Sequence, residues 1–127
     1  MTRTPRGNRE AVIVVVEPNV FMRFVIVESL QRKGRTLLHA TCLEEALMIV
    51  RSSHVSVDLA ILAVDFVDPH ELEVCREIAQ YSPKTRILVV SDSLPARRLA
   101  KAEQWNAVQR PFHPHPLLQK VRAALSR

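Results

Sequence analysis

The chain has 127 residues, the length of one ordinary domain. Hydrophobic residues make up 47% of it and charged residues 24%, which is typical of a soluble globular protein and excludes a disordered one. The two glycines are too few for a dinucleotide-binding loop or a Walker-type phosphate loop, and the two cysteines are too few for a metal cluster or a disulfide scaffold.

The net charge of +5 is concentrated near the N-terminus. Arg3, Arg6 and Arg9 lie in residues 1–10, which we expect to form a disordered basic tail before a single domain over 11–127. Since the three arginines carry +3 of the +5, the rest of the chain carries only +2. Aromatic residues, at 5%, are too few for a base-stacking surface, so nucleic acid binding through the tail is the least favoured function.

No apolar run approaches the roughly 20 residues that a membrane span needs. The N-terminal apolar run, Ala11–Val16, is also shorter than the apolar stretch of a signal peptide. We therefore expect a cytoplasmic protein without a membrane partner.

Apolar, β-branched runs alternate with helix-like segments along the chain. Because strands of a parallel sheet are covered on both faces, they have continuous apolar runs of this kind. Gly34 is expected to end the first helix, which runs to Lys33, and Thr41–Glu44 matches a capping box that opens the second. Strands are expected at 11–16, 36–40, 58–64, 86–90 and 106–109, with helices at 21–33, 43–50, 70–80, 95–102 and 114–125.

This alternation predicts an α/β fold with a doubly wound, five-stranded parallel sheet. In such sheets the functional crevice lies at the carboxyl ends of the strands. The candidate site residues at those ends are Glu17, Pro18, Ala63, Asp65, Ser91 and Arg110.

Six short motifs then occur in order on the expected elements: Val15–Asn19 with Arg23, Glu44–Leu47, Asp58–Leu62, Leu72–Arg76, Val89–Ser91 and Arg110–Phe112. With these motifs, the chain resembles the CheY-like receiver domain of bacterial response regulators from about Val12 to Leu125. The resemblance implies a flavodoxin-like fold with strand order 2-1-3-4-5. It also implies a two-component phosphorelay, in which an aspartate on the third strand accepts a phosphoryl group from a histidine kinase with Mg²⁺ bound.

The acidic positions implied by the resemblance are only partly kept. The first acid of the first strand falls on Glu17, but the second, a direct metal ligand in the family, falls on Pro18. The phosphoacceptor falls on Ala63, which has no nucleophile. A single carboxylate is a poor Mg²⁺ site, so Glu17 is a weak metal candidate, and we expect no cofactor. The chain is thus interpreted as a pseudo-receiver without catalytic residues.

The remaining positions of the phosphoryl pocket keep some of their chemistry. The switch hydroxyl is retained as Ser91, and the lysine that precedes a proline is replaced by Arg110 before Pro111. Arg110 is expected to form an internal ion pair, with either Glu17 or Asp65, in place of Mg²⁺.

Asp65 supports an alternative interpretation. Asp65–Pro69 reproduces the D-x-x-x-P pattern that follows the phosphoacceptor in the family, although this register needs a gap that the Ala63 register does not. Asp65 also has the same parity as Ala63 on the strand, so its side chain can point into the crevice. It is therefore the fallback acceptor of a self-phosphorylating, Mg²⁺-dependent receiver.

The partner that we expect is a protein of a signalling pathway, either a histidine kinase or an effector. Arg97, Arg98 and Lys101 on the fourth helix, followed by Trp105, form the candidate interface, because arginine and tryptophan are enriched at interfaces. A homodimer through the fourth helix, fifth strand and fifth helix is the other assembly considered.

Overall fold

The computed structural model describes residues 10–32, 34–52, 54, 56–110 and 114–126. The expected disordered tail, apart from Glu10, and the candidate residue Pro111 lie outside these residues. The described chain contains no helix long and apolar enough to cross a membrane.

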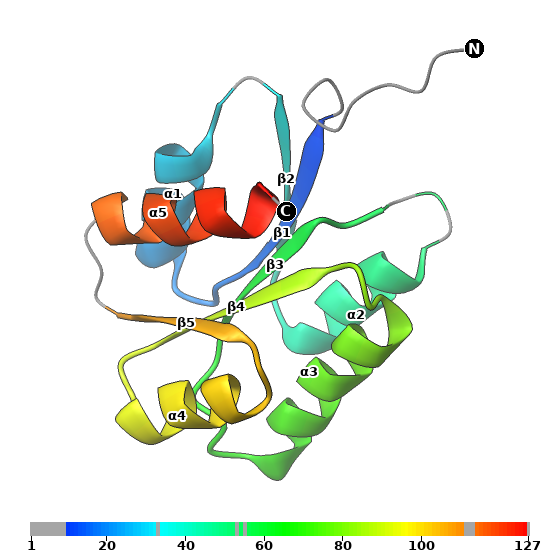
Figure 1. Cartoon of the computed structure of the whole chain (residues 1–127), viewed down its shortest axis with the longest axis vertical. Helices are drawn as coiled ribbons and strands as arrows, with labels where there is room; N and C mark the ends of the chain where they lie inside the picture. The colour runs from blue at the N-terminus through cyan, green and yellow to red at the C-terminus, as the bar shows by residue number, and fades with distance from the viewer. Residues whose placement is uncertain (1–9, 33, 53, 55, 111–113, 127) are drawn as a thin grey trace.

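Five parallel strands form one twisted sheet (Figure 1). The strand order, β2-β1-β3-β4-β5, confirms the predicted fold. Each strand lies close to an apolar run recognised in the sequence, because a buried parallel strand needs apolar side chains on both faces. The strands are β1 (Ala11–Val16), β2 (Arg35–Ala40), β3 (Leu59–Ala63), β4 (Arg86–Ser91) and β5 (Asn106–Gln109).

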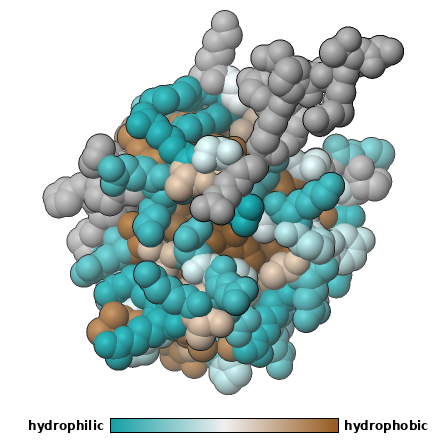
Figure 2. All heavy atoms as spheres, in the orientation of Figure 1, coloured by the Kyte–Doolittle hydropathy of each residue, from teal (hydrophilic) through white to brown (hydrophobic). Residues whose placement is uncertain are grey.

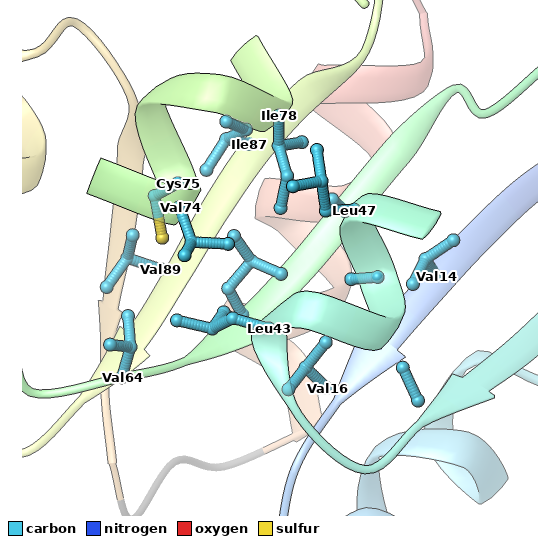
Figure 3. Packing of buried hydrophobic residues seen from close by; sticks show 14 of the residues in the cluster. Val14, Val16, Leu43, Leu47, Val64, Val74, Cys75, Ile78, Ile87 and Val89 are labelled. Atoms are coloured by element: carbon cyan, nitrogen blue, oxygen red, sulfur yellow. The ribbon is translucent and has the colours of Figure 1, made fainter. Parts of the chain in front are cut away.

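Helices cover both faces of the sheet (Figure 1). On one face lie α1 (Val20–Leu30) and α5 (Pro114–Leu125), and on the other lie α2 (Leu43–Arg51), α3 (Pro69–Tyr81) and α4 (Leu94–Ala102). Alternate residues of each strand therefore enter different cores. On β1, for example, Val14 and Val16 pack toward α2 and α3, as Figure 3 shows, while Ile13 and Val15 pack with residues of α1 and α5.

The face of the domain seen in Figure 2 is mostly hydrophilic. In the view of Figure 2, polar residues surround small, separate hydrophobic areas. The described chain nevertheless has exposed large hydrophobic side chains, among them Phe21 and Phe24 in the first half of α1, which are 71% and 61% exposed.

Two helix boundaries differ from the prediction. Helix α1 ends at Leu30 rather than Lys33, because the chain must reverse before β2 begins at Arg35. Gly34, with φ +88°, lies in that reversal, and its carbonyl accepts a hydrogen bond from the Ala11 N–H at 2.8 Å. Its left-handed conformation was thus expected correctly, but it serves the turn into β2 and not the helix end.

The predicted capping box of α2 is displaced by one residue. The helix begins after Cys42, whose side chain forms no capping hydrogen bond. Glu45, rather than Glu44, reaches back to accept the N–H of Thr41 at 2.9 Å. The reason is tertiary, since the Glu44 carboxylate is held instead by His70 at the start of α3.

Candidate functional site

A hollow of about 550 Å³ lies at the carboxyl ends of the strands. Five of the candidate residues line it together, namely Glu17, Pro18, Ala63, Asp65 and Arg110. The sixth, Ser91, is buried at the end of β4 and adjoins the hollow through its hydrogen bond to Asp65. Residues from β1, β3 and β5 meet here because the strands are parallel and end at one edge.

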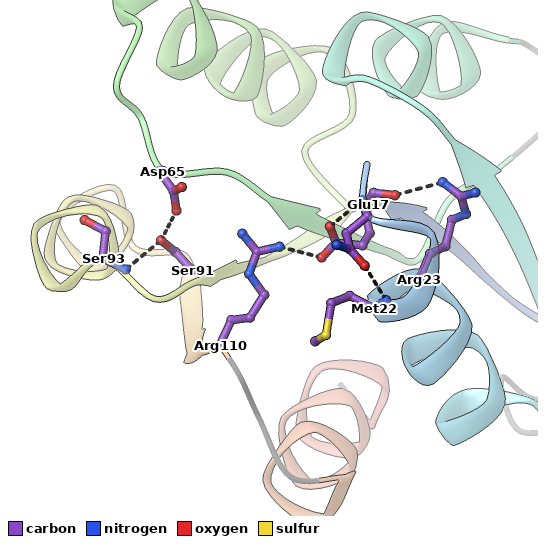
Figure 4. Close-up of polar contacts among 8 residues, drawn as sticks. Glu17, Met22, Arg23, Asp65, Ser91, Ser93 and Arg110 are labelled. Carbon is purple, nitrogen blue, oxygen red and sulfur yellow. Dashed lines mark hydrogen bonds and ion pairs between the residues drawn. The ribbon is translucent and has the colours of Figure 1, made fainter.

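Glu17 is a buried carboxylate with two partners. Its side chain is 1% exposed, and the guanidinium of Arg110 lies 2.7 Å from Oε1 (Figure 4). The Asn19 N–H donates to Oε2 at 3.0 Å, at the turn that leads into α1. The backbone carbonyl of Glu17 accepts a hydrogen bond from Arg23 at 2.9 Å. Each oxygen of this residue therefore has a donor from the protein itself.

Arg110 is the residue directly after β5, and its side chain extends to Glu17. Its backbone N–H donates to the Ser91 carbonyl at 3.1 Å, and this hydrogen bond holds the backbone of Arg110 beside the end of β4. The side chain then extends across the hollow and remains 22% exposed. Of the two acidic partners considered for Arg110, the structure pairs it with Glu17.

Ser91 connects three segments. Its hydroxyl donates to Asp65 Oδ1 and accepts the Ser93 N–H at 3.0 Å (Figure 4). Its backbone carbonyl also accepts a hydrogen bond from Arg97 Nη1 at 3.0 Å. The loop after β3 is therefore tied to the start of α4 through one serine, and the side chain of Arg97 is turned back toward the sheet.

The donors of this hollow do not fit a Mg²⁺ ion. This ion requires several oxygen ligands in a near-octahedral arrangement. Glu17 is already engaged by Arg110 and Asn19, and Pro18 and Ala63 have no side-chain oxygen. Among the described residues, no group of three or more acidic, histidine or cysteine side chains is placed to hold a metal.

A second hollow of about 300 Å³ adjoins the first, since Pro18, Ala63 and Glu71 line both. At its rim, His70 Nε2 lies 2.7 Å from Glu44 Oε2. The hydrogen bond that His70 donates to the Glu44 carboxylate raises the pKa of His70, while the Glu44 backbone N–H and then His70 lower the pKa of Glu44. The sequence reasoning missed this pair because its members are 26 residues apart, and only the α2–α3 packing brings them together.

The interface candidates do not form one uniform surface. Arg98 and Lys101 are exposed on α4, whereas the guanidinium of Arg97 contacts the Ser91 carbonyl. Trp105 is half-buried and packs against the core cluster beneath α2 and α3. Arg98 and Lys101 are thus the members of this set with freely accessible side chains.

No family model and no curated protein sequence matches the chain. Solved structures do match it over nearly its full length. A response regulator from Thermotoga maritima superposes with a TM-score of 0.79 at 21% identity, covering 93% of this chain and 99% of the other. A two-component response regulator from Clostridium difficile gives a TM-score of 0.78 at 20% identity, covering 93% and 98%.

A response regulator receiver protein from Burkholderia phymatum is also similar, with a TM-score of 0.76 at 22% identity over 92% of this chain and 96% of the other. At these identities the likeness establishes the architecture, and it agrees with the strand order and helix placement described above. The chain therefore has the fold of CheY-like response-regulator receiver domains.

Proposed function

We propose that this chain is an atypical, cytoplasmic bacterial receiver of a two-component pathway. It signals by binding another protein, without phosphorylation and without catalytic activity of its own. The proposal rests on the receiver fold together with the altered chemistry of the hollow at the carboxyl ends of the strands.

Phosphoryl transfer to a receiver needs a carboxylate nucleophile and oxygen ligands for Mg²⁺. At the position that the resemblance assigns to the nucleophile, Ala63 presents a methyl group to the hollow. At the position of the second metal ligand, Pro18 presents a saturated ring. Both substitutions remove oxygen atoms from the same hollow, which argues against the phosphorylation reaction.

The ion pair between Arg110 and Glu17 is the observation that carries the proposal. In a buried site, an acid without a counter-charge is costly, so a carboxylate that binds no metal needs another cation. Arg110 supplies that cation at 2.7 Å, and its long planar guanidinium allows it to reach across the hollow. The charges that would otherwise serve phosphoryl chemistry neutralise each other.

A partner would use the side of the domain that carries α4. Arg98 and Lys101 are exposed there and favour an acidic surface on the partner, which can be a kinase, an effector or a second copy of this chain. Ser91 and Arg97 hold the start of this helix in place from within, so the surface does not depend on a phosphoryl group to be formed.

The test is intact-mass spectrometry after incubation with acetyl phosphate and Mg²⁺. The wild-type chain and Asp65→Asn should both show no phosphoryl adduct. Ala63→Asp alone should also remain unlabelled, because Pro18 still leaves the metal short of an oxygen ligand and Arg110 still holds Glu17. Labelling of the wild type, or strong labelling of Ala63→Asp alone, would contradict the proposal.

A second function is favoured by the position of Asp65. Its carboxylate lines the hollow and accepts the hydrogen bond of Ser91, so an acid and the retained hydroxyl are adjacent. If Asp65 is a phosphoacceptor, the same mass experiment gives an adduct in the wild type that disappears in Asp65→Asn. The two proposals thus predict opposite results for one sample.

A further inference from the structure

Helix α1 is apolar on more than the side that it buries. Eight of its eleven residues are apolar, and its charged residues are Arg23 and Glu28. Its buried residues, Ile26 and Leu30, pack in the core between the helix and the sheet. A helix that is covered on one side normally carries polar residues on the other. The apolar residues on the outer side of α1 therefore need a second protein surface.

The outer side of α1 carries one contiguous apolar patch. It consists of Val20, Phe21 and Phe24, which are 70%, 71% and 61% exposed and are here called the α1 patch. Residues three and four positions apart are neighbours on a helix surface, so the three side chains adjoin one another. Single exposed hydrophobic residues are ordinary, whereas a contiguous patch marks an interaction site. The other exposed large hydrophobic residues of the described chain are scattered over different elements, namely Met48, Val67, Tyr81 and Leu94.

The charges of α1 are placed so that a second α1 complements them. Arg23 is turned inward and donates to the Glu17 carbonyl at 2.9 Å (Figure 4), which leaves Glu28 as the exposed charge of the helix. Glu28 lies in the last turn, at the electronegative end, and forms no ion pair within the described part of the chain. The first turn, at the electropositive end, contains no acidic residue. The acid is thus at the wrong end for its own helix.

Two copies of α1 satisfy both features when they pack antiparallel about a two-fold axis between Phe21 and Phe24. Phe21 of one copy then meets Phe24 of the other, and each contact occurs twice. Glu28, one turn beyond Phe24, lies beside the first turn of the other helix, which lacks an acid. A second copy of the chain therefore supplies the apolar residues and the acid at the spacing that this surface requires.

The α1 patch provides enough area for a weak dimer. An aromatic side chain contributes about 150 to 250 Å², so at their exposures Phe21 and Phe24 offer roughly 200 to 330 Å² per copy. A standard interface buries about 800 Å² per partner, of which the two phenylalanines supply about a quarter to two-fifths. Val20, Glu28 and the residues around them supply the rest. This area favours reversible association over a permanent dimer.

We infer that α1 is a homodimer surface, at which two copies of this chain pack antiparallel through Val20, Phe21 and Phe24. It is distinct from the α4 side proposed for a signalling partner. Because α1 and α4 cover opposite faces of the sheet (Figure 1), the dimer leaves both α4 surfaces accessible. A partner with two matching sites would bind such a dimer more tightly than a single domain, since its second contact is intramolecular.

The test is sedimentation velocity of the full chain at about 5 to 500 µM, a range suited to the weak association of a small interface. With rising concentration, the average mass of the wild type should increase from 14.4 kDa toward twice that value. Phe21→Ser/Phe24→Ser should keep the fold, because both positions are exposed, and should remain monomeric throughout. The matched control, Met48→Ser/Tyr81→Ser, removes two exposed hydrophobic residues from α2 and α3 and should dimerise like the wild type.

A charge exchange tests the orientation of the second copy. Asn19→Asp keeps the side-chain oxygen that accepts the Met22 N–H at 2.9 Å, but it adds an acid where Glu28 of the other copy arrives. Glu28→Lys brings a cation to the same electropositive end. Since each effect occurs twice in the dimer, each variant should raise the dissociation constant by about 3- to 30-fold. In Asn19→Asp/Glu28→Lys the exchanged charges attract across the interface, so the affinity should return toward that of the wild type.

Three results would each overturn the inference: a wild type that stays monomeric at every concentration, equal behaviour of the two double-serine variants, or a double charge variant that associates no more tightly than the single ones. Binding of a monomeric wild type to phosphatidylcholine vesicles through Phe21 and Phe24 would assign the α1 patch to lipid and would overturn it as well. None of these results depends on phosphorylation or on the partner at α4.

Discussion

Replacing Arg110 with methionine should destabilise the fold by about 2 to 3 kcal/mol. The change keeps the apolar part of the side chain but removes the cation 2.7 Å from the buried Glu17 carboxylate, leaving Asn19 as its donor. Breaking a buried ion pair from one side typically costs about 3 to 5 kcal/mol. A cost at or below the bottom of this range is expected here because Arg110 is 22% exposed and the adjacent hollow lets water reach the vacated oxygen.

The assay is urea unfolding of the variants in a double-mutant cycle. Glu17→Gln removes the charge but keeps an amide oxygen and should cost about 1 kcal/mol, since the freed Arg110 can turn toward solvent. The double variant should be more stable than the sum of the two single losses predicts, with a coupling of about 1 to 2 kcal/mol. A cost below about 0.5 kcal/mol for Arg110→Met, or strict additivity, would refute the reasoning.

Three other predictions concern groups outside this pair. In NMR titrations His70 should titrate above its ordinary pKa of 6.5 and return toward that pKa in Glu44→Gln, and a His70 pKa that Glu44→Gln leaves unchanged would contradict this. The stability that the pair contributes is present below pH 6.5 and is lost as the pH rises through the raised pKa. A thiol reagent should modify the exposed Cys42 in the native protein, but it should modify the buried Cys75 only after unfolding, because burial raises the pKa of Cys75 to about 12. Modification of both thiols at one rate would contradict the burial of Cys75 in the core. Gly34→Ala should lower the free energy of unfolding by about 1 kcal/mol in chemical denaturation, because a Cβ is strained at φ +88° even where the space around it is open. An unchanged free energy of unfolding would argue against the left-handed turn.

The order of the elements could be predicted because the apolar runs leave few alternatives. The three central runs, Ala11–Val16, Leu59–Ala63 and Ile87–Val90, are apolar on both faces, and with two weaker runs and the helical segments between them they favour a parallel sheet. The same argument predicts Glu17, Ala63 and Arg110 at one edge of the sheet, where they line one hollow. The alternation of apolar runs and helical segments was sufficient for this prediction, because it depends only on residues that are neighbours in the sequence.

The pairing within the site could not be predicted in the same way. Glu17 and Asp65 were both available to Arg110, and the choice depends on how far a guanidinium reaches across the hollow. The end of α1 and the cap of α2 were misplaced for a related reason, since the turn at Gly34 and the contact of Glu44 with another helix decide them. Local signals identify the residue types, and tertiary contacts select their partners.

On the proposed function, the residues that replace the phosphoryl chemistry are consistent with one another, and the hollow is a rebuilt site rather than a damaged one. Loss of a metal ligand alone would leave Glu17 as a buried acid without a counter-charge. Here that acid is paired with Arg110, and no buried side-chain nitrogen or oxygen of the described residues lacks a partner.

Asp65 and Ser91 likewise satisfy each other rather than waiting for a ligand. A site that had only lost its function would retain unpaired groups, whereas Glu17 is paired with Arg110 and Asp65 with Ser91, as the proposed function requires. We therefore expect that restoring phosphorylation requires Pro18→Asp, Ala63→Asp and Arg110→Lys together, because each single change leaves a missing oxygen or a competing ion pair.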